Sequence, residues 1–317
     1  MKQIIMLLFV FTFLAGCSQP QTDESLISEN GQGSLRVIAS VFPQYDFVRQ
    51  IAGDRVELSM LISPGGEPHA FEPSPRDIIA LNNADLIVYV GGHGEAWVDM
   101  ILDSLDQPNL QRVALVDLVD VIHEHEHSHG HDDHHEHEHS HGEFDEHVWT
   151  SPRNAISIVR ALTDILTELD PDNANYFREN SEVFILELEE LDRAFAEVVA
   201  EGNRSTVIFG DRFPFRYLMN AYGLNYYAAF PGCSAETQAS PATIAFLIDK
   251  VNAESIPVVF YTEFSARMIA NVIVEATGAR PFELHSAHNV SHADFIGGVT
   301  YLDIMRQNLE QLREALN

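Results

Sequence analysis

The chain has 317 residues, a formal net charge of −30 at pH 7 and only two cysteines. This length allows two domains of ordinary size. The excess of acidic side chains argues against nucleic acid or an anionic membrane surface as a partner, and it favours a domain that attracts cations.

The N-terminal segment resembles a bacterial lipoprotein signal. An apolar run from Ile4 to Leu14 is too short for a membrane span of roughly 20 residues, and it ends in the sequence LAGC at Leu14 to Cys17. The pattern implies cleavage before Cys17 and attachment of lipid to its sulfur. The alternative is an ordinary secretory signal that happens to contain a cysteine. We therefore expect residues 1–16 to be a signal peptide and residues 17–34 to be a polar tether.

A lipid on Cys17 would leave Cys233 as the one remaining thiol, so no internal disulfide could form. The exported part of the chain must then be stabilised by its hydrophobic core. We expect a monomer that is anchored to the cell membrane through Cys17 and lies on the extracytoplasmic face.

Strands and helices alternate in the first half of the mature chain. The strand predictions rest on β-branched apolar runs, and the helix predictions rest on apolar periodicity with Pro or Gly at the ends. The predicted strands are Leu35–Phe42, Val56–Ile62, Asp85–Val90 and Val113–Leu115, and the predicted helices are Pro43–Ile51, Ser74–Asn83 and one that starts near Trp97. The alternation predicts an α/β lobe with a mainly parallel sheet over residues 35–170.

Eleven of the sixteen histidines lie between His123 and His147. The ten from His123 to His141 alternate with Glu, Asp, Ser and Gly without an apolar residue, so we expect residues 123–143 to form a loop outside the core. His147 differs, because the apolar pair Val148–Trp149 follows it and supplies packing. Imidazole is the commonest protein ligand for metals and is largely neutral near pH 7. The segment therefore indicates transition-metal binding, against the alternative of a solvated acidic spacer.

Two helices are predicted after His147. One covers Ser151–Leu169, and a longer one runs from Asp172 to about Ala200 and is closed by Gly202. At a rise of ~1.5 Å per residue the longer helix spans roughly 40 Å, which is the scale of a whole domain. We expect residues 171–202 to form a strut that links two lobes.

The alternation of strands and helices begins again after this strut. The predicted strands are Thr206–Gly210, Tyr226–Phe230, Pro257–Glu263 and Pro281–Leu284, and the predicted helices are Phe213–Tyr222, Ala242–Val251, Ser265–Thr277 and Val299–Leu316. This pattern predicts a second α/β lobe over residues 203–317. No clear internal sequence repeat relates the two halves.

Three histidines outside the histidine-rich run occupy positions suited to ligand binding. His69 lies in a loop shaped by Pro and Gly after the second strand, His147 leads into a capped helix, and His285 follows the last strand of the second lobe. Binding loops follow the carboxyl ends of strands in open α/β sheets, so these donors meet between the lobes if the strand ends converge. A nitrogen-rich set with one oxygen ligand suits tetrahedral Zn²⁺.

Other donors are open to two interpretations. The histidines at positions 93, 288 and 292 are either auxiliary donors or loop histidines without a role. Cys233 is either a soft metal donor or a small buried residue.

Several motifs resemble the zinc/manganese cluster of solute-binding proteins of ABC importers. They are PGGEPHAFEPSPRD at Pro64–Asp77, DEHVWTSPRNA at Asp145–Ala155, YGL at Tyr222–Leu224, TEFS at Thr262–Ser265, ATGA at Ala276–Ala279 and the closing YLDIMRQNLEQL. The resemblance covers nearly the whole mature chain. It implies two α/β lobes joined by one long rigid helix, a metal site between the lobes, and delivery of the metal to a membrane permease with its ATPase. The histidine-rich loop is typical of the zinc-specific members, which favours Zn²⁺ over Mn²⁺.

The resemblance assigns four positions to metal ligands. The first two match His69 and His147. The third, a histidine in the family, falls on Arg212, and the fourth, usually a carboxylate, falls on His285. Asp211 is the nearest substitute oxygen donor. The resemblance therefore implies a set of His69, His147, His285 and Asp211.

Two other classes of function compete with metal capture for import. A zinc hydrolase would need an open metal position and a general base, but no HExxH motif lies in a helical context: HEHEH at His123–His127 has no apolar support for a helix. We therefore expect a protein that is not an enzyme. A surface adhesin would fit the lipoprotein signal and remains the alternative.

Overall fold

The computed structural model describes residues 34–68, 71–105, 107–123, 144–230, 232 and 239–317. The predicted signal peptide, nearly all of the tether, His69, Cys233 and most of the histidine-rich segment lie outside these residues. Within the described ranges, no helix combines the length and the apolar character needed to cross a membrane.

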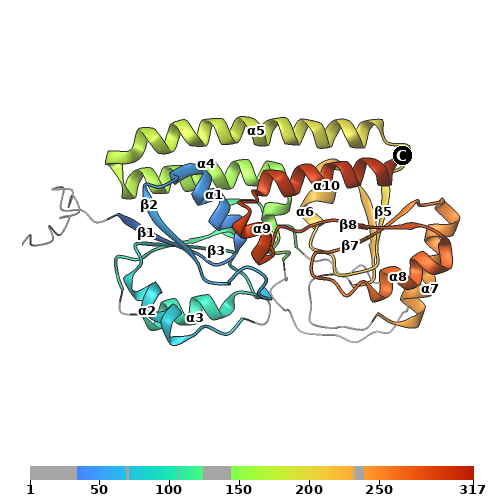
Figure 1. Cartoon of the computed structure of the whole chain (residues 1–317), viewed down its shortest axis with the longest axis horizontal. Helices are drawn as coiled ribbons and strands as arrows, with labels where there is room; N and C mark the ends of the chain where they lie inside the picture. The colour runs from blue at the N-terminus through green and yellow to red at the C-terminus, as the bar shows by residue number, and fades with distance from the viewer. Residues whose placement is uncertain (1–33, 69–70, 106, 124–143, 231, 233–238) are drawn as a thin grey trace, which may run out of the picture. The chain divides into compact units, whose positions relative to one another are not determined.

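Four strands make the first sheet: β1 (Leu35–Ala39), β2 (Val56–Met60), β3 (Leu86–Tyr89) and β4 (Gln111–Ala114). They are all parallel and lie in the order β2-β1-β3-β4. The helices that connect them are α1 (Phe42–Ala52), α2 (Pro75–Asn83) and α3 (Ala96–Ser104), with α1 on one side of the sheet and α2 and α3 on the other (Figure 1). Every residue of β3 is buried, as expected for a parallel strand covered on both faces.

The second sheet repeats this arrangement in a different sequence. Its strands are β5 (Thr206–Phe209), β6 (Asn225–Ala228), β7 (Val258–Tyr261) and β8 (Arg280–Glu283), and its helices include α6 (Arg216–Tyr222), α7 (Pro241–Glu254) and α8 (Met268–Thr277). The strands are parallel in the order β6-β5-β7-β8. In both sheets the first strand therefore takes the second position, and the crossovers place equivalent loops at equivalent strand ends.

A layer of helices spans both lobes (Figure 1). Its members are α4 (Pro152–Leu169), α5 (Ala174–Glu201) and α10 (Tyr301–Leu316). The 28 residues of α5 extend ~42 Å at the usual helical rise. Its buried residues, including Phe177, Phe184 and Leu191, recur at helical spacing, and α5 packs on α1, α4 and α10. The predicted strut is thus confirmed as the helix that joins the lobes.

A buried carboxylate fastens α10 to α1. Asp46 has no exposed surface, and it accepts hydrogen bonds from the Tyr301 backbone N–H at 2.6 Å and from Arg49 at 2.5 Å. Arg49 also donates to the Val299 carbonyl at 2.8 Å. Burial raises the pKa of Asp46, although Arg49 and the Tyr301 N–H oppose that shift. The last helix of the chain is therefore fixed to the first helix.

The two-lobed, mainly parallel α/β fold is confirmed, but three local predictions differ from the structure. The helix expected from Phe213 begins at Arg216, because Phe213 and Phe215 first insert their rings beside Phe209 in the core. The polar loop before the last helix contains a short helix, α9 (His292–Ile296), whose start is capped by the Ser291 side chain. The helix expected from Ser265 begins at Met268, because Arg267 has a φ of +58°.

Candidate metal-binding site

His147 lies at the end of the first lobe, just before a single helical turn, η3 (Val148–Thr150). The imidazole is buried, with 6% of the residue exposed. Asp145 Oδ1 accepts the His147 backbone N–H at 2.9 Å and lies 3.0 Å from Nδ1. A carboxylate can only accept this contact, so the ring proton sits on Nδ1 and the lone pair on Nε2. Metal-binding histidines in proteins are oriented in this way by a carboxylate.

Asp145 is itself held from the second lobe, by Arg216 and Tyr217, and its backbone N–H donates to the carbonyl of Ile122 at 3.0 Å. Arg216 Nε lies 3.4 Å from Asp145 Oδ2, and the Tyr217 hydroxyl donates to the Asp145 carbonyl at 2.7 Å. The same hydroxyl accepts the backbone N–H of Ile122 at 3.1 Å. Burial alone would raise the pKa of Asp145, but His147 and Arg216 hold it below its ordinary value. Asp145 therefore stays ionised and keeps His147 oriented.

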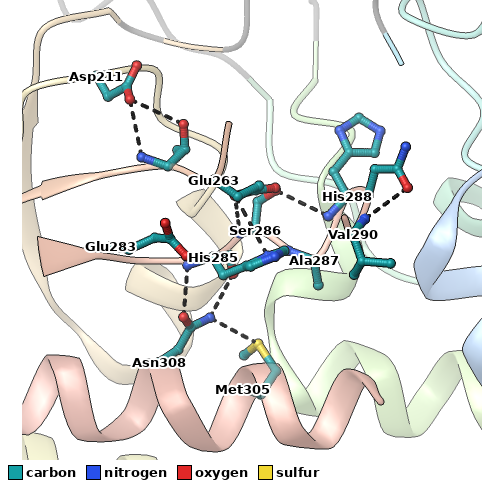
Figure 2. A network of polar contacts seen from close by, with 12 residues as sticks. Asp211, Glu263, Glu283, His285, Ser286, Ala287, His288, Val290, Met305 and Asn308 are labelled. Carbon is teal, nitrogen blue, oxygen red and sulfur yellow. Dashed lines mark hydrogen bonds and ion pairs between the residues drawn. The ribbon is translucent and has the colours of Figure 1, made fainter. Parts of the chain in front are cut away.

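A second histidine meets His147 from the loop after β8. The ring of His288 lies edge-on to His147, with centroids 5.3 Å apart, and 5.0 Å from the ring of Trp149. Trp149 Nε1 donates to the Ser286 carbonyl at 2.8 Å, which fixes this loop against η3. Figure 2 shows the His288 ring turned away from β8 and α10. Two imidazoles from sequence positions 141 apart are therefore brought together.

The loop that carries His288 also holds the segment that leads to His69. Asn289 Nδ2 donates to the carbonyls of Ser63 and Gly66 at 3.0 and 2.8 Å, and Gly65 N–H donates to the Val290 carbonyl at 2.8 Å. Gly65 has a φ of +81°, a conformation that favours glycine. These bonds fix the chain up to Pro68, the last described residue before His69.

A cavity of about 10 Å³ lies between the two histidines and the first lobe. This is close to the smallest space that holds one water molecule. Its lining residues are Pro68, Val90, Gly94, Glu95, Glu146, His147, Trp149 and His288.

Two carboxylates, those of Glu95 and Glu146, contribute to this cavity. Glu95 is 4% exposed, and its Oε2 accepts the Val90 N–H at 2.6 Å, whereas its Oε1 has no hydrogen-bond partner among the described residues. Burial raises the pKa of Glu95 to about 7. Burial also raises the pKa of Glu146, whose Oε1 accepts the Gly94 N–H at 2.7 Å. A Cβ at Gly92 would lie 2.7 Å from Glu146, so only glycine permits this approach.

A larger cavity of about 260 Å³ opens at the end of the second sheet. Asp211 lines it, but both carboxylate oxygens already accept hydrogen bonds: Oδ1 from the Arg212 N–H at 2.8 Å, and Oδ2 from the Thr262 N–H at 3.2 Å. Glu263 accepts the Ser286 N–H at 2.8 Å and the Ser286 hydroxyl. Pro68 and His288 line both cavities, so the two spaces are neighbours.

The structure places His285 differently from His288 (Figure 2). Its backbone N–H and C=O both bond to the Asn308 side chain of α10, at 2.8 and 2.7 Å. Its Nδ1 accepts the Ala287 N–H at 3.0 Å and lies 3.8 Å from Glu263 Oε2. His285 lines neither of the two cavities among the described residues.

The donors predicted from the sequence are therefore divided in the structure. His147 lies at the small cavity and Asp211 at the large one, while His69 is outside the described residues. His288, considered only as an auxiliary donor, is the histidine that meets His147. The one signal for His288 in the sequence is the spacing of two histidines in HSAH, at positions 285 and 288. The sequence does not predict the turn at Ala287, which has a φ of +59° and lies between the two histidines. In the described part of the chain, no group of three or more His, Cys, Asp or Glu side chains is arranged to hold a metal.

A family model described as zinc-uptake complex component A periplasmic (ZnuA) matches residues 37–315. The chain is 31% identical over 323 residues to the zinc-binding lipoprotein AdcA of Streptococcus pneumoniae (strain ATCC BAA-255 / R6), which covers 99% of this chain and 61% of AdcA. It is 31% identical over 306 residues to the high-affinity zinc uptake system protein ZnuA of Bacillus subtilis (strain 168). That alignment covers 96% of this chain and 94% of the Bacillus subtilis protein.

A solved structure is similar over most of the fold. The Zn(II)-bound ZnuA-like domain of Streptococcus pneumoniae AdcA aligns with a TM-score of 0.73 and 29% sequence identity, and the alignment covers 90% of this chain and 99% of that domain. The chain spans 61% of the length of the pneumococcal AdcA protein that it matches.

Proposed function

Since this chain belongs to the ZnuA family, whose model matches residues 37–315, we propose that it is the extracytoplasmic zinc-binding component of an ABC-type importer. It captures Zn²⁺ outside the cytoplasm and delivers the ion to a membrane permease that works with an ATPase. The zinc-related names of the AdcA and ZnuA relatives support this assignment.

The observation that carries the proposal is the meeting of His147 and His288, with His147 oriented by Asp145. We propose His147 and His288 as nitrogen donors. His69 is proposed as the third, because it comes directly after Pro68 in the sequence and Pro68 lines the same cavity. Asp211 and His285 are the two candidates for the one remaining position. A set rich in imidazole suits Zn²⁺, whereas Mn²⁺ prefers carboxylate and carbonyl oxygens.

Capture and release impose a different design from catalysis. A transport site is served by ligands that surround the ion, because an open coordination position would leave a reactive water on the zinc. The proposed histidines supply three ligands of this sphere, and one further donor has to complete it. We therefore propose a binding protein and not an enzyme.

The N-terminal sequence supports a proposal for the location of the protein. We propose that lipid on Cys17 anchors a monomer to the extracytoplasmic face of the membrane, close to the permease. The name of the pneumococcal relative, a lipoprotein, supports this anchor. We further propose that the histidines between His123 and His141 collect zinc at low affinity or sense its abundance.

A zinc titration of the chain without its signal peptide, in competition with a chromophoric chelator, tests the proposal. We expect one tight site in the wild type. His147→Ala should weaken that site by roughly 100-fold or more, because losing a ligand costs more than losing its orienting partner. His292→Ala, which removes an exposed histidine of α9, should leave it unchanged. The same titration of His288→Ala, His285→Ala and Asp211→Ala identifies the other ligands.

A second variant separates the tight site from the histidine-rich segment. Replacing the nine histidines from His125 to His141 by Asn should remove weak zinc binding and keep the tight site. If tight binding disappears in this variant and survives in His147→Ala, the segment is the true site and the proposal is wrong.

A further inference from the structure

The cavity of about 260 Å³ in the second lobe has no role in a site made of His147 and His288 alone. It is slightly smaller than the pockets of about 300–1,000 Å³ that hold drug-sized ligands, so a small metabolite would fit. His288 lines this cavity and the small one. A molecule in the larger cavity would therefore reach a metal held by the two histidines.

The carboxylates that line this cavity are engaged within the lobe. Asp211 accepts hydrogen bonds from Thr262 and from the Arg212 backbone, and Glu263 accepts them from Ser286. These bonds connect the ends of β5 and β7 and the loop after β8. The acids therefore act first as fasteners of the loops.

The guanidinium groups of the cavity, unlike its carboxylates, are not hydrogen-bonded to the described residues of the lobe. Arg212 has one ion pair, with Glu67 Oε2 at 3.8 Å, and Arg267 has one, with Glu283 at 3.9 Å. Both distances exceed hydrogen-bond length. Neither guanidinium makes a hydrogen bond to another described residue, although each group carries five N–H donors. The cavity thus offers unused donors to an anion.

Arg212 also stands where the family pattern places a histidine. A fixed positive charge there repels a bare cation, and it supplies no lone pair. Together with His69, the pair of His147 and His288 would leave one position of a tetrahedral ion to a further donor. An anionic molecule bound to Arg212 would solve both problems at once.

We propose that the cavity binds a small carboxylate chelator, which pairs with Arg212 and supplies donor atoms to the zinc ion at His147 and His288. Guanidinium and carboxylate form bidentate, charge-assisted hydrogen bonds, and hydroxy- and amino-carboxylates also coordinate zinc through oxygen or nitrogen. The cargo is then a zinc chelate and not the bare ion. This inference rests on the proposed zinc-binding function.

Native mass spectrometry with zinc and increasing citrate tests the inference. We expect the wild type to retain one citrate for each zinc. Free citrate competes for zinc, so simple competition predicts a certain loss of apparent zinc affinity. We expect the measured affinity in citrate to be at least roughly tenfold higher than that prediction, because citrate joins the complex instead of only removing zinc. Arg212→Gln should bind zinc but retain citrate roughly 10- to 100-fold more weakly, since a charge-assisted pair is lost.

Two further variants serve as controls for this experiment. Arg160→Gln removes an exposed arginine that pairs with Glu189 at 3.3 Å on the helical layer, and it should retain citrate like the wild type. Arg212→Lys keeps the positive charge but loses the planar guanidinium that binds a carboxylate through two hydrogen bonds. Its retention of citrate should lie between those of the wild type and Arg212→Gln. If the protein binds zinc without citrate at every citrate concentration, and its zinc affinity falls as simple competition predicts, the inference is wrong and the proposed function stays intact. Absence of tight zinc binding with and without citrate refutes the proposed function instead.

Discussion

The two lobes share one strand order and differ in what they place at the carboxyl ends of their strands. The first lobe ends in a buried network of His147, Asp145 and Trp149 around a space of about 10 Å³. The second ends in an open cavity of about 260 Å³ with half-exposed arginines. The shared topology determines where the loops meet. The individual side chains determine that one half is rigid and preformed, and that the other half has room for a further molecule.

Removing Trp149 should have the largest effect, because this residue fixes the rigid half. Its side chain is fully buried and donates to the Ser286 carbonyl. We expect Trp149→Ala to lower the free energy of unfolding by about 3–5 kcal/mol in urea titrations, since it leaves a large cavity. Ile79→Ala, at a residue of the same lobe that is 63% exposed, should change it by less than about 0.5 kcal/mol. Equal effects of the two variants would mean that the buried network around Trp149 does not stabilise the first lobe.

Glu95 makes the rigid half sensitive to pH. Its pKa is raised from 4.5 to about 7, so between these values the folded protein holds a proton that the unfolded chain has released. The resulting stability is complete below about pH 4.5 and is lost as the pH rises through about 7, with a total near 3 kcal/mol. The Glu95→Gln variant should not show this loss of stability as the pH rises. Urea unfolding of the metal-free protein at about pH 5 and about pH 8 measures this difference.

The matched control for Glu95 is Glu168→Gln, at an exposed position of α4. This variant should keep the pH dependence of the wild type. If Glu95→Gln also keeps it, the buried carboxyl does not control the pH dependence of stability.

Asp145 should matter for zinc through His147. We expect Asp145→Asn to weaken zinc binding roughly 10- to 100-fold, because a neutral amide orients the imidazole less firmly than a carboxylate. Asp192→Asn is a close control, since Asp192 also accepts from an arginine and a tyrosine, at 2.8 Å each, on the helical layer. Equal zinc affinities in the two variants, measured by chelator competition, would reduce Asp145 to a purely structural role.

Arg212→His should give the smallest effect and would make the second lobe more like the first. The change removes a positive charge and adds an imidazole at the position where the family pattern has a histidine. We expect zinc affinity in chelator-free buffer to rise roughly tenfold, since nearby like charges cost on the order of 1 kcal/mol at a surface. Citrate should then compete with the protein for zinc and no longer join the complex. An unchanged affinity would mean that Arg212 lies too far from the metal to influence it.

The sequence predicted the fold better than the site, for a physical reason. Alternating apolar strands and amphipathic helices are local patterns, so both sheets and the long α5 could be predicted. The orientation of His288 depends on contacts between distant segments: Trp149 with Ser286, and the backbone N–H of Phe42 with the His288 carbonyl at 3.4 Å. No local pattern encodes these. The hydrogen bond that occupies Asp211 Oδ2 is equally nonlocal, because it comes from Thr262.

The loop after β8 is part of the second lobe by sequence, yet it is hydrogen-bonded to the first lobe at Ser63, Gly65 and Gly66. If the lobes separate, we expect these bonds to keep His288 with His147 and the bonds of Ser286 to Glu263 to break, so that the end of the second sheet moves away. Dissociation of a bound ion would then occur in two kinetic steps. The ion first loses whatever the second lobe contributes, and it leaves the histidine pair only afterwards, so the residence time on the protein is the sum of both steps.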